Sequence, residues 1–195
     1  SNIIAGFQIT CVGDNRCYSY LPSRQGDTYS DRVALHVLKH IDPDFKQYSY
    51  LDRGSDEREY CSPGVDLPVA SVMRSKYGEY PEYHTSLDNL DLITFDGLQG
   101  SYNVYQRMIE CIEFNNIPRV TVLCEPQLGK RGLYPQLSTK NSYKKVKKMM
   151  DLLAYADGEH DFLEIAEIIN TPIWELMPLA DKLINEDLLL IHLPK

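Results

Sequence analysis

The first two thirds of the chain alternate short apolar runs with amphipathic stretches. Apolar, β-branched runs at residues 3–12 and 67–73 have the length of buried strands, and turn-forming residues follow the first of them. Between these runs, apolar residues at helical spacing begin after Ser30, which we take as the N-cap, and stop at Asp42-Pro43. The pattern therefore predicts strands separated by helices.

A long helix is predicted after Asp96-Gly97. Its apolar side chains recur at steps of three and four residues, which places them on one face. These side chains are Leu98, Tyr102, Tyr105, Ile109 and Ile112. Short strands that alternate with amphipathic helices predict an α/β domain, with a mainly parallel sheet flanked by helices. Loops that follow such strands gather at one edge of the sheet, so residues 13–14, 54–56 and 83–84 are expected to meet.

The last part of the chain has a different pattern. A connection containing glycine and proline follows a strand candidate at residues 120–124, and we place the domain boundary there. The division is a first domain at 1–125, a linker at 126–142 and a second domain at 143–195. Three helical patterns followed by an apolar strand predict a small winged-helix domain. Pro178 falls inside the third helix, where we expect a kink or a later start.

Composition narrows the class of protein. Hydrophobic residues make up 43% and charged residues 25% of the chain, as in globular proteins with a packed core. No apolar run reaches about 18 residues, so no membrane span is expected, and the first residues lack the features of a signal peptide. The five cysteines include no C-x-x-C pair. That pattern favours reduced thiols and a cytoplasmic location over a disulfide framework or a structural zinc site.

Charge argues against nucleic acid as a partner. The net charge is −8, whereas phosphate neutralisation requires clustered Lys and Arg. Between residues 159 and 187, Lys182 is the sole basic residue against eight carboxylates, so DNA phosphates would repel the expected winged helix. A contact with another protein is the better prediction for this domain. The carboxylates are Glu159, Asp161, Glu164, Glu167, Glu175, Asp181, Glu186 and Asp187.

His84 is the first candidate for chemistry. It stands between Tyr83 and Thr85, with Asp88 four residues further on. A metal-bound imidazole needs an acceptor for its second nitrogen, and a nearby carboxylate would serve. The alternative is a loop histidine bonded to backbone, which is the more common case. Tyrosines are unusually dense up to Tyr83 and fit either a polar-aromatic cleft or buried interfaces, so we assign them no role.

Carboxylates supply the other candidates. Asp56 and Glu57 follow Gly54-Ser55, where a tight turn can bring paired carboxylates into a cleft, one facing a metal or acting as base. The alternative is a helix start, with Ser55 as N-cap and the acids favouring the helix dipole, and both can hold together. Asp14 follows the first predicted strand and is either a metal ligand or an acidic turn residue.

These segments together resemble a known family. Residues 54–57, 61–68, 80–91 and 125–135, with the winged-helix tail, are similar to the bacterial aminopeptidase-like proteins associated with polysaccharide biosynthesis. The resemblance covers essentially the whole chain. That group belongs to the wider set of zinc-dependent aminopeptidases and glutaminyl cyclases. The resemblance implies an aminopeptidase-like α/β sheet, of which this chain is the carboxyl-terminal portion.

The resemblance also assigns roles. It implies that His84 is a zinc ligand and that Asp56 hydrogen-bonds the water or the substrate amine. Glu57 stands where the wider set has a histidine, so its role departs from the pattern, although it stays with Asp56 as a candidate catalytic residue. The ligand aspartate that the family carries at the end of the first strand falls here at residues 10–11. Asp14, just beyond, is the candidate for that second metal ligand.

One feature separates this chain from complete family members. A catalytic zinc takes about three protein ligands plus water, with a general base in reach. No residue before Asp14 is His, Asp or Glu, so the resemblance implies that an upstream half, or a partner chain, supplies the missing groups. The predicted function is the carboxyl-terminal portion of a zinc-dependent hydrolase of small peptides or amides, inactive alone. The alternative function is a non-catalytic interaction module with an acidic winged helix. Another copy of the chain is also a candidate partner.

Overall fold

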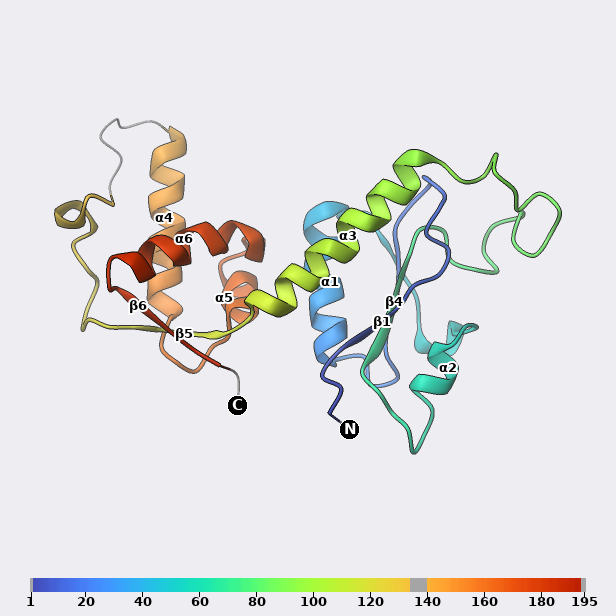
Figure 1. Ribbon diagram of the computed structural model, residues 1–195, viewed down its shortest axis with the longest axis horizontal. Coiled ribbons are helices and arrows are strands. Elements are labelled where there is room, and N and C mark those ends of the chain that lie inside the picture. The colour runs from blue at the N-terminus through green and yellow to red at the C-terminus, as the bar shows by residue number, and fades with distance from the viewer. Residues whose placement is uncertain (1, 134–139, 194–195) are drawn as a thin grey trace. The chain divides into compact units, whose positions relative to one another are not determined.

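The computed structural model describes residues 2–133 and 140–193, and of residues 140–142 it describes the backbone alone (Figure 1). The chain forms two compact units, Ser1–Ile109 and Glu110–Lys195. None of the helices in the described part of the chain is long and apolar enough to cross a membrane.

The first unit is built on a four-stranded sheet. Its strands are β1 (Gly6–Gln8), β2 (Ser19–Leu21), β3 (Lys46–Gln47) and β4 (Val69–Met73), in the order β1-β4-β2-β3. The pairs β1–β4 and β2–β3 are parallel and the pair β2–β4 is antiparallel, so the predicted mainly parallel sheet is confirmed. Every residue of β4 is buried, as its inner position requires, whereas β1 is an edge strand and lies beside β4 (Figure 1).

Helix α1 (Tyr29–Ile41) begins earlier than predicted. Its N-cap is Thr28, because the buried carboxylate of Asp31 accepts hydrogen bonds from the amide and hydroxyl of Thr28. Ser30 is not the cap. Its hydroxyl is buried between strands, where it accepts from Gly6 N and donates to the carbonyl of Pro68. Two short elements follow β3, the 3₁₀ turn η1 (Tyr50–Asp52) and helix α2 (Glu57–Tyr60).

Helix α3 (Phe95–Phe114) turns inward a face that only partly overlaps the predicted one, through Tyr105. Leu98, Tyr102 and Ile109 of the expected apolar face are 47%, 63% and 54% exposed. The buried side chains of the helix within this unit lie one position earlier, at Ser101, Val104 and Met108.

Close backbone approach explains the choice of face. A Cβ atom at Gly97 would lie 2.2 Å from the carbonyl oxygen of Gly13, so only glycine lets the helix come this near to the loop after β1. Ser101 donates to the carbonyl of Val12, and Tyr105 Oη donates to the carbonyls of Gln8 and Val72. Small and hydrogen-bonding residues thus select the inner face of α3, and several large apolar side chains remain outside.

The second unit is a winged helix, as predicted. Strand β5 (Ile117–Val120) pairs antiparallel with β6 (Leu189–His192). Between them lie the 3₁₀ turn η2 (Leu128–Arg131) and helices α4 (Lys140–Tyr155), α5 (Phe162–Ile168) and α6 (Ile173–Asn185). Pro178 lies inside α6, which begins five residues before it at Ile173, so a later start of the helix at the proline is wrong and the kink stays a prediction. Residues 117–120, which the sequence grouped with the first domain, belong to this unit through their pairing with β6. The proposed linker holds η2 and the start of α4, and its residues 134–139 lie outside the described part.

Candidate functional site

Loops from three parts of the first unit meet beyond the carboxyl ends of β1 and β4. The two strands are parallel, with Gln8 opposite Ser71, so the segments that follow them leave from the same edge of the sheet. Tyrosines fill the space where these segments meet. The tyrosine cluster, as we name it, consists of Tyr48, Tyr50, Tyr77, Tyr80 and Tyr83. Tyr77 is its buried centre, packed with Leu21 and Met73.

Glu57 is held inside this cluster. It is fully buried, and its Oε1 accepts from Tyr77 Oη at 2.6 Å, Gly54 N at 2.8 Å and Ser55 N at 2.9 Å. Burial by itself would raise the pKa of Glu57, but these hydrogen bonds outweigh it and lower the pKa below its ordinary value. A Cβ at Gly54 would lie 2.8 Å from the Tyr77 ring, so glycine is needed for this approach. Glu57 is therefore an ionised carboxylate that fixes the 54–57 turn.

Asp56 lies at the surface of the same turn. It is exposed, and the side-chain amide of Gln8 reaches Ser55 Oγ at 3.4 Å and Asp56 Oδ2 at 3.5 Å. Asp56 takes the N-cap position of α2 without a side-chain cap, so Ser55 is not the cap that the sequence offered. The Gln8 contact joins the end of β1 to the 54–57 turn, as the topology predicted. It leaves the Asp56 carboxylate accessible to a ligand.

Asp14 has a clear structural task. It is buried, and its Oδ1 accepts from Ser75 Oγ at 2.8 Å and Arg16 N at 3.0 Å, while Oδ2 accepts from Ser75 N at 2.9 Å. The carboxylate thereby ties the loop after β1 to the segment after β4. These contacts match the turn-residue alternative, and the role of metal ligand stays a prediction.

His84 lies on the rim of the tyrosine cluster. Its backbone is left-handed, with φ +57°, a conformation that few residues other than glycine adopt. The ring is exposed and stacks on Tyr83, with centroids 4.0 Å apart and planes 16° apart. No hydrogen bond among the described residues engages the ring nitrogens, so the backbone-bonded alternative is not what the structure shows. Stacking fixes the ring plane and leaves its nitrogens open.

A line of contacts connects His84 to the carboxylates. The Tyr83 ring, on which His84 stacks, lies 6.4 Å from that of Tyr77, and the Tyr77 hydroxyl bonds Glu57. No hydrogen bond joins His84 directly to Asp56 within the described residues.

Cys11 is one of the two residues, with Thr10, at which the sequence resemblance expects the family's aspartate ligand. It has φ +47°, packs against the tyrosine cluster and accepts a hydrogen bond from Tyr80 Oη at 3.7 Å. Sequence reasoning assigned no role to Tyr77, Tyr80 or Gln8, which hold the site together. The density of tyrosines was the available signal, because a phenol can pack in the core and still present a polar hydroxyl.

The residues present do not by themselves fit a catalytic zinc. Such a site needs about three protein donors. Among the described residues, neither His84 nor Asp14 belongs to a group of three potential ligands, and both oxygens of Asp14 already accept hydrogen bonds. Of the two predicted metal ligands, His84 is the one whose donor atoms are open.

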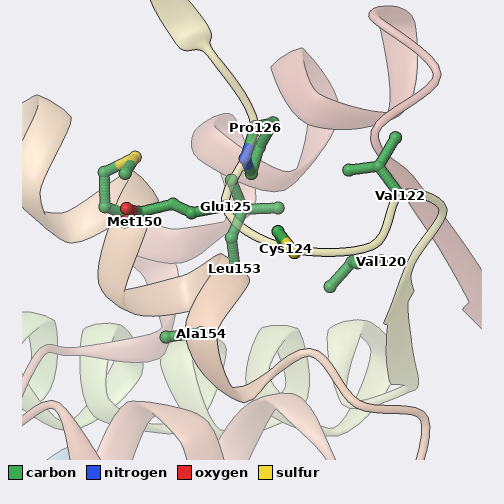
Figure 2. A pocket seen from close by; sticks show the side chains of 8 residues that line it. All are labelled: Val120, Val122, Cys124, Glu125, Pro126, Met150, Leu153 and Ala154. Atoms are coloured by element: carbon green, nitrogen blue, oxygen red, sulfur yellow. The ribbon is translucent and has the colours of Figure 1, made fainter.

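The second unit has a hollow of its own, shown in Figure 2. Its volume is about 330 Å³, and side chains from the segment that includes the end of β5 face others from α4. The lining residues are Val120, Val122, Cys124, Glu125, Pro126, Met150, Leu153 and Ala154. Apolar walls with a single carboxylate are suited to binding and supply no acid–base pair.

Two family models match consecutive parts of the chain. Residues 1–115 match a domain of unknown function, DUF4910, and residues 116–190 match a winged helix-turn-helix. The chain belongs to the DUF4910 family. The second match agrees with the winged helix of the second unit.

Relatives of this DUF4910 protein support the resemblance drawn from its sequence. One, from Clostridium acetobutylicum, is provisionally named a polysaccharide biosynthesis protein with aminopeptidase-like domain, and is 38% identical over 96% of this chain and 44% of the relative. A crystal structure provisionally named as a peptidase of the same species superposes with a TM-score of 0.87 and 36% identity, covering 98% of this chain and 42% of that one. The aminopeptidase-like resemblance is confirmed, and the chain spans less than half the length of either relative.

Proposed function

We propose that this chain is the carboxyl-terminal portion of a zinc-dependent aminopeptidase-like hydrolase. The observation that carries the proposal is the exposed ring of His84, held flat on Tyr83 with its nitrogens open, in a chain that covers less than half of its aminopeptidase-like relatives. An imidazole in this state can donate to a metal whose other ligands come from outside these residues.

The other candidate residues receive roles from their contacts. Asp56, exposed beside Gln8, holds the substrate amine or the water by hydrogen bonding. Glu57 is buried and acts on the site by fixing the 54–57 turn and Tyr77. The remaining zinc ligands and the general base come from an upstream half of the same protein or from a partner chain, so the chain alone is inactive. A small peptide or amide is the substrate, and five free thiols fit a cytoplasmic location.

Zinc stoichiometry tests this proposal. The longer protein, carrying its upstream half, is purified and its zinc measured by elemental mass spectrometry for the wild type and for His84→Ala. We expect stoichiometric zinc in the wild type and at least a tenfold loss of zinc affinity on removal of one of about three ligands.

The control is His160→Ala, which removes a half-buried histidine of the second unit whose ring bonds Asp157. It should leave the zinc content unchanged. Full zinc in His84→Ala, or no zinc in the wild type, would remove His84 from the metal site and the hydrolase proposal with it.

The second candidate is a non-catalytic interaction module. The observation in its favour is the acidic winged helix, where eight carboxylates stand against Lys182 between residues 159 and 187. A segment with this excess of carboxylates attracts a basic protein partner and repels DNA. A longer protein without zinc that binds a protein partner in a salt-dependent way would support this candidate. Tight, salt-dependent DNA binding would contradict this candidate.

A further inference from the structure

A cavity of about 220 Å³ opens in the first unit beside the tyrosine cluster. It lies between the loop after β1, strand β3 and the segment after β4. The residues that matter for its chemistry are Arg16, Lys46, Tyr48, Lys76, Glu79 and Tyr80. A space of this size admits a small polar group and is below the range of whole drug-sized ligands, about 300–1,000 Å³.

Lys76 gives the cavity its character. The residue is only 6% exposed, and its ammonium donates one hydrogen bond, to the carbonyl of Tyr77 at 3.1 Å. The ammonium lies 4.5 Å from the centre of the Tyr77 ring and 5.3 Å from that of Tyr48. No carboxylate of the described residues forms an ion pair with it. Because an ammonium carries three donors, a buried lysine with one carbonyl and two ring faces is incompletely satisfied.

Several other charged groups around the cavity already have bonding partners. Arg16 binds Glu82 with two parallel hydrogen bonds of 2.9 and 2.6 Å, so the charges of this pair offset each other. The Asp14 carboxylate accepts from Ser75 and from the Arg16 amide. Lys46 is exposed on the lining and Glu79 is the one lining carboxylate. Two lysines against Glu79 make this wall basic in a chain whose net charge is −8.

We propose that this cavity binds a small anionic group, a carboxylate or a phosphate. Lys76 is the central contact, because an anion would supply the acceptor that its remaining ammonium donors lack, and Lys46 adds attraction from the rim. The lining residue Tyr80 also contacts Tyr83, which stacks on His84. The anion therefore belongs to a substrate that reaches His84. This last assignment rests on the proposed function, whereas the anion site rests on the cavity and Lys76.

The competing explanation is that Lys76 only braces the two tyrosine rings. Cation–π contacts of this kind stabilise by about 0.5–2 kcal/mol and require no ligand. In that case the cavity would show no saturable affinity for anions, so direct binding distinguishes the two explanations.

The test is a titration of the full 195-residue chain with inorganic phosphate and, separately, with acetate, at constant ionic strength held by chloride. Binding is followed by amide chemical shifts in NMR spectra. We expect saturable shifts in the segments that line the cavity, and a loss of affinity of about tenfold or more in Lys76→Met, since a charge-assisted hydrogen bond is removed. The stronger of the two responses distinguishes a phosphate ester from a carboxylate as the natural group.

Lys144→Met is the matched control, because Lys144 is exposed in the second unit and its loss changes the charge equally. Its affinity should equal that of the wild type. If Lys76→Met does not fold, judged by circular dichroism, Lys46→Met decides, with an expected loss of about threefold or more for a rim charge. No saturable shifts, or wild-type affinity in the deciding variant, would overturn the anion site. If the anion site is overturned in this way and the longer protein still binds zinc through His84, the proposed function holds.

Discussion

Glu57 shows how one side chain can serve a site without facing a ligand. Its Oε1 gathers three donors, from Gly54, Ser55 and Tyr77, and its Oε2 is buried without a hydrogen-bond partner among the described residues. Desolvation opposes ionisation of such a carboxylate, but the three donors favour it, and the balance lowers the pKa. The negative charge therefore stabilises the turn that presents Asp56.

We predict that Glu57→Gln lowers the free energy of unfolding at pH 7 by about 1–3 kcal/mol, since a charged acceptor becomes a neutral one. The pKa of Glu57 is lower in the folded state than in the unfolded state, where it is about 4.3. The charge therefore contributes its full stabilisation above about pH 4.3, and this stabilisation is lost as the pH falls through the folded-state pKa. Urea unfolding at pH 7, 5 and 3 should show the difference between wild type and variant shrinking at pH 3. Glu59→Gln, at an exposed position of the same helix, is the control. A difference that does not change with pH would show that the charge is not what stabilises the turn.

At the scale of elements, α3 shows the limit of hydrophobic periodicity. The position of the helix was predictable, because its apolar residues repeat at helical steps, but the inner face was not. The pattern pointed to Leu98, Tyr102 and Ile109, whereas the contact depends on Gly97 and Ser101 lying against backbone of the loop after β1. Backbone approach between distant segments leaves little trace in a local apolar pattern.

Gly97→Ala tests this explanation of α3. Helix propensity alone predicts that alanine stabilises a helical position by about 0.5–1 kcal/mol. The structure predicts the opposite sign, a loss of about 1–3 kcal/mol, because the new Cβ would lie 2.2 Å from Gly13 O and 2.5 Å from Asp14 O. Thermal and urea unfolding of the variant measure the change, with the exposed Gln99→Ala of the same helix as control. A stabilised Gly97→Ala would show that α3 does not approach the loop this closely.

The sequence predicted which segments form the candidate site better than it predicted how their side chains are buried and bonded. Strand ends indicated that residues 13–14, 54–56 and 83–84 would come near one another. The tyrosine cluster bears this out for 54–56 and 83–84, because Gly54 N donates to Tyr77 Oη and the Tyr77 ring lies 6.4 Å from that of Tyr83. The sequence could not show that Glu57 is buried or that Asp14 is occupied by Ser75. Both facts depend on hydrogen bonds from residues about twenty or sixty positions away.

At the scale of the whole molecule, two units with different chemistry share one chain. The first carries an open imidazole, an exposed carboxylate and a basic cavity at one end of its sheet. The second is an acidic winged helix with an apolar hollow. Relatives more than twice as long contain both units, which agrees with a chain that contributes part of a larger site.

Anomalous X-ray scattering at the zinc absorption edge tests the central claim most directly. Crystals of the longer protein grown with zinc would be measured above and below the edge, and the difference would locate any bound zinc. We predict a peak within bonding distance, about 2.0–2.1 Å, of a ring nitrogen of His84. A zinc peak elsewhere with the His84 ring still lying free on Tyr83, or no peak at all, would contradict the account.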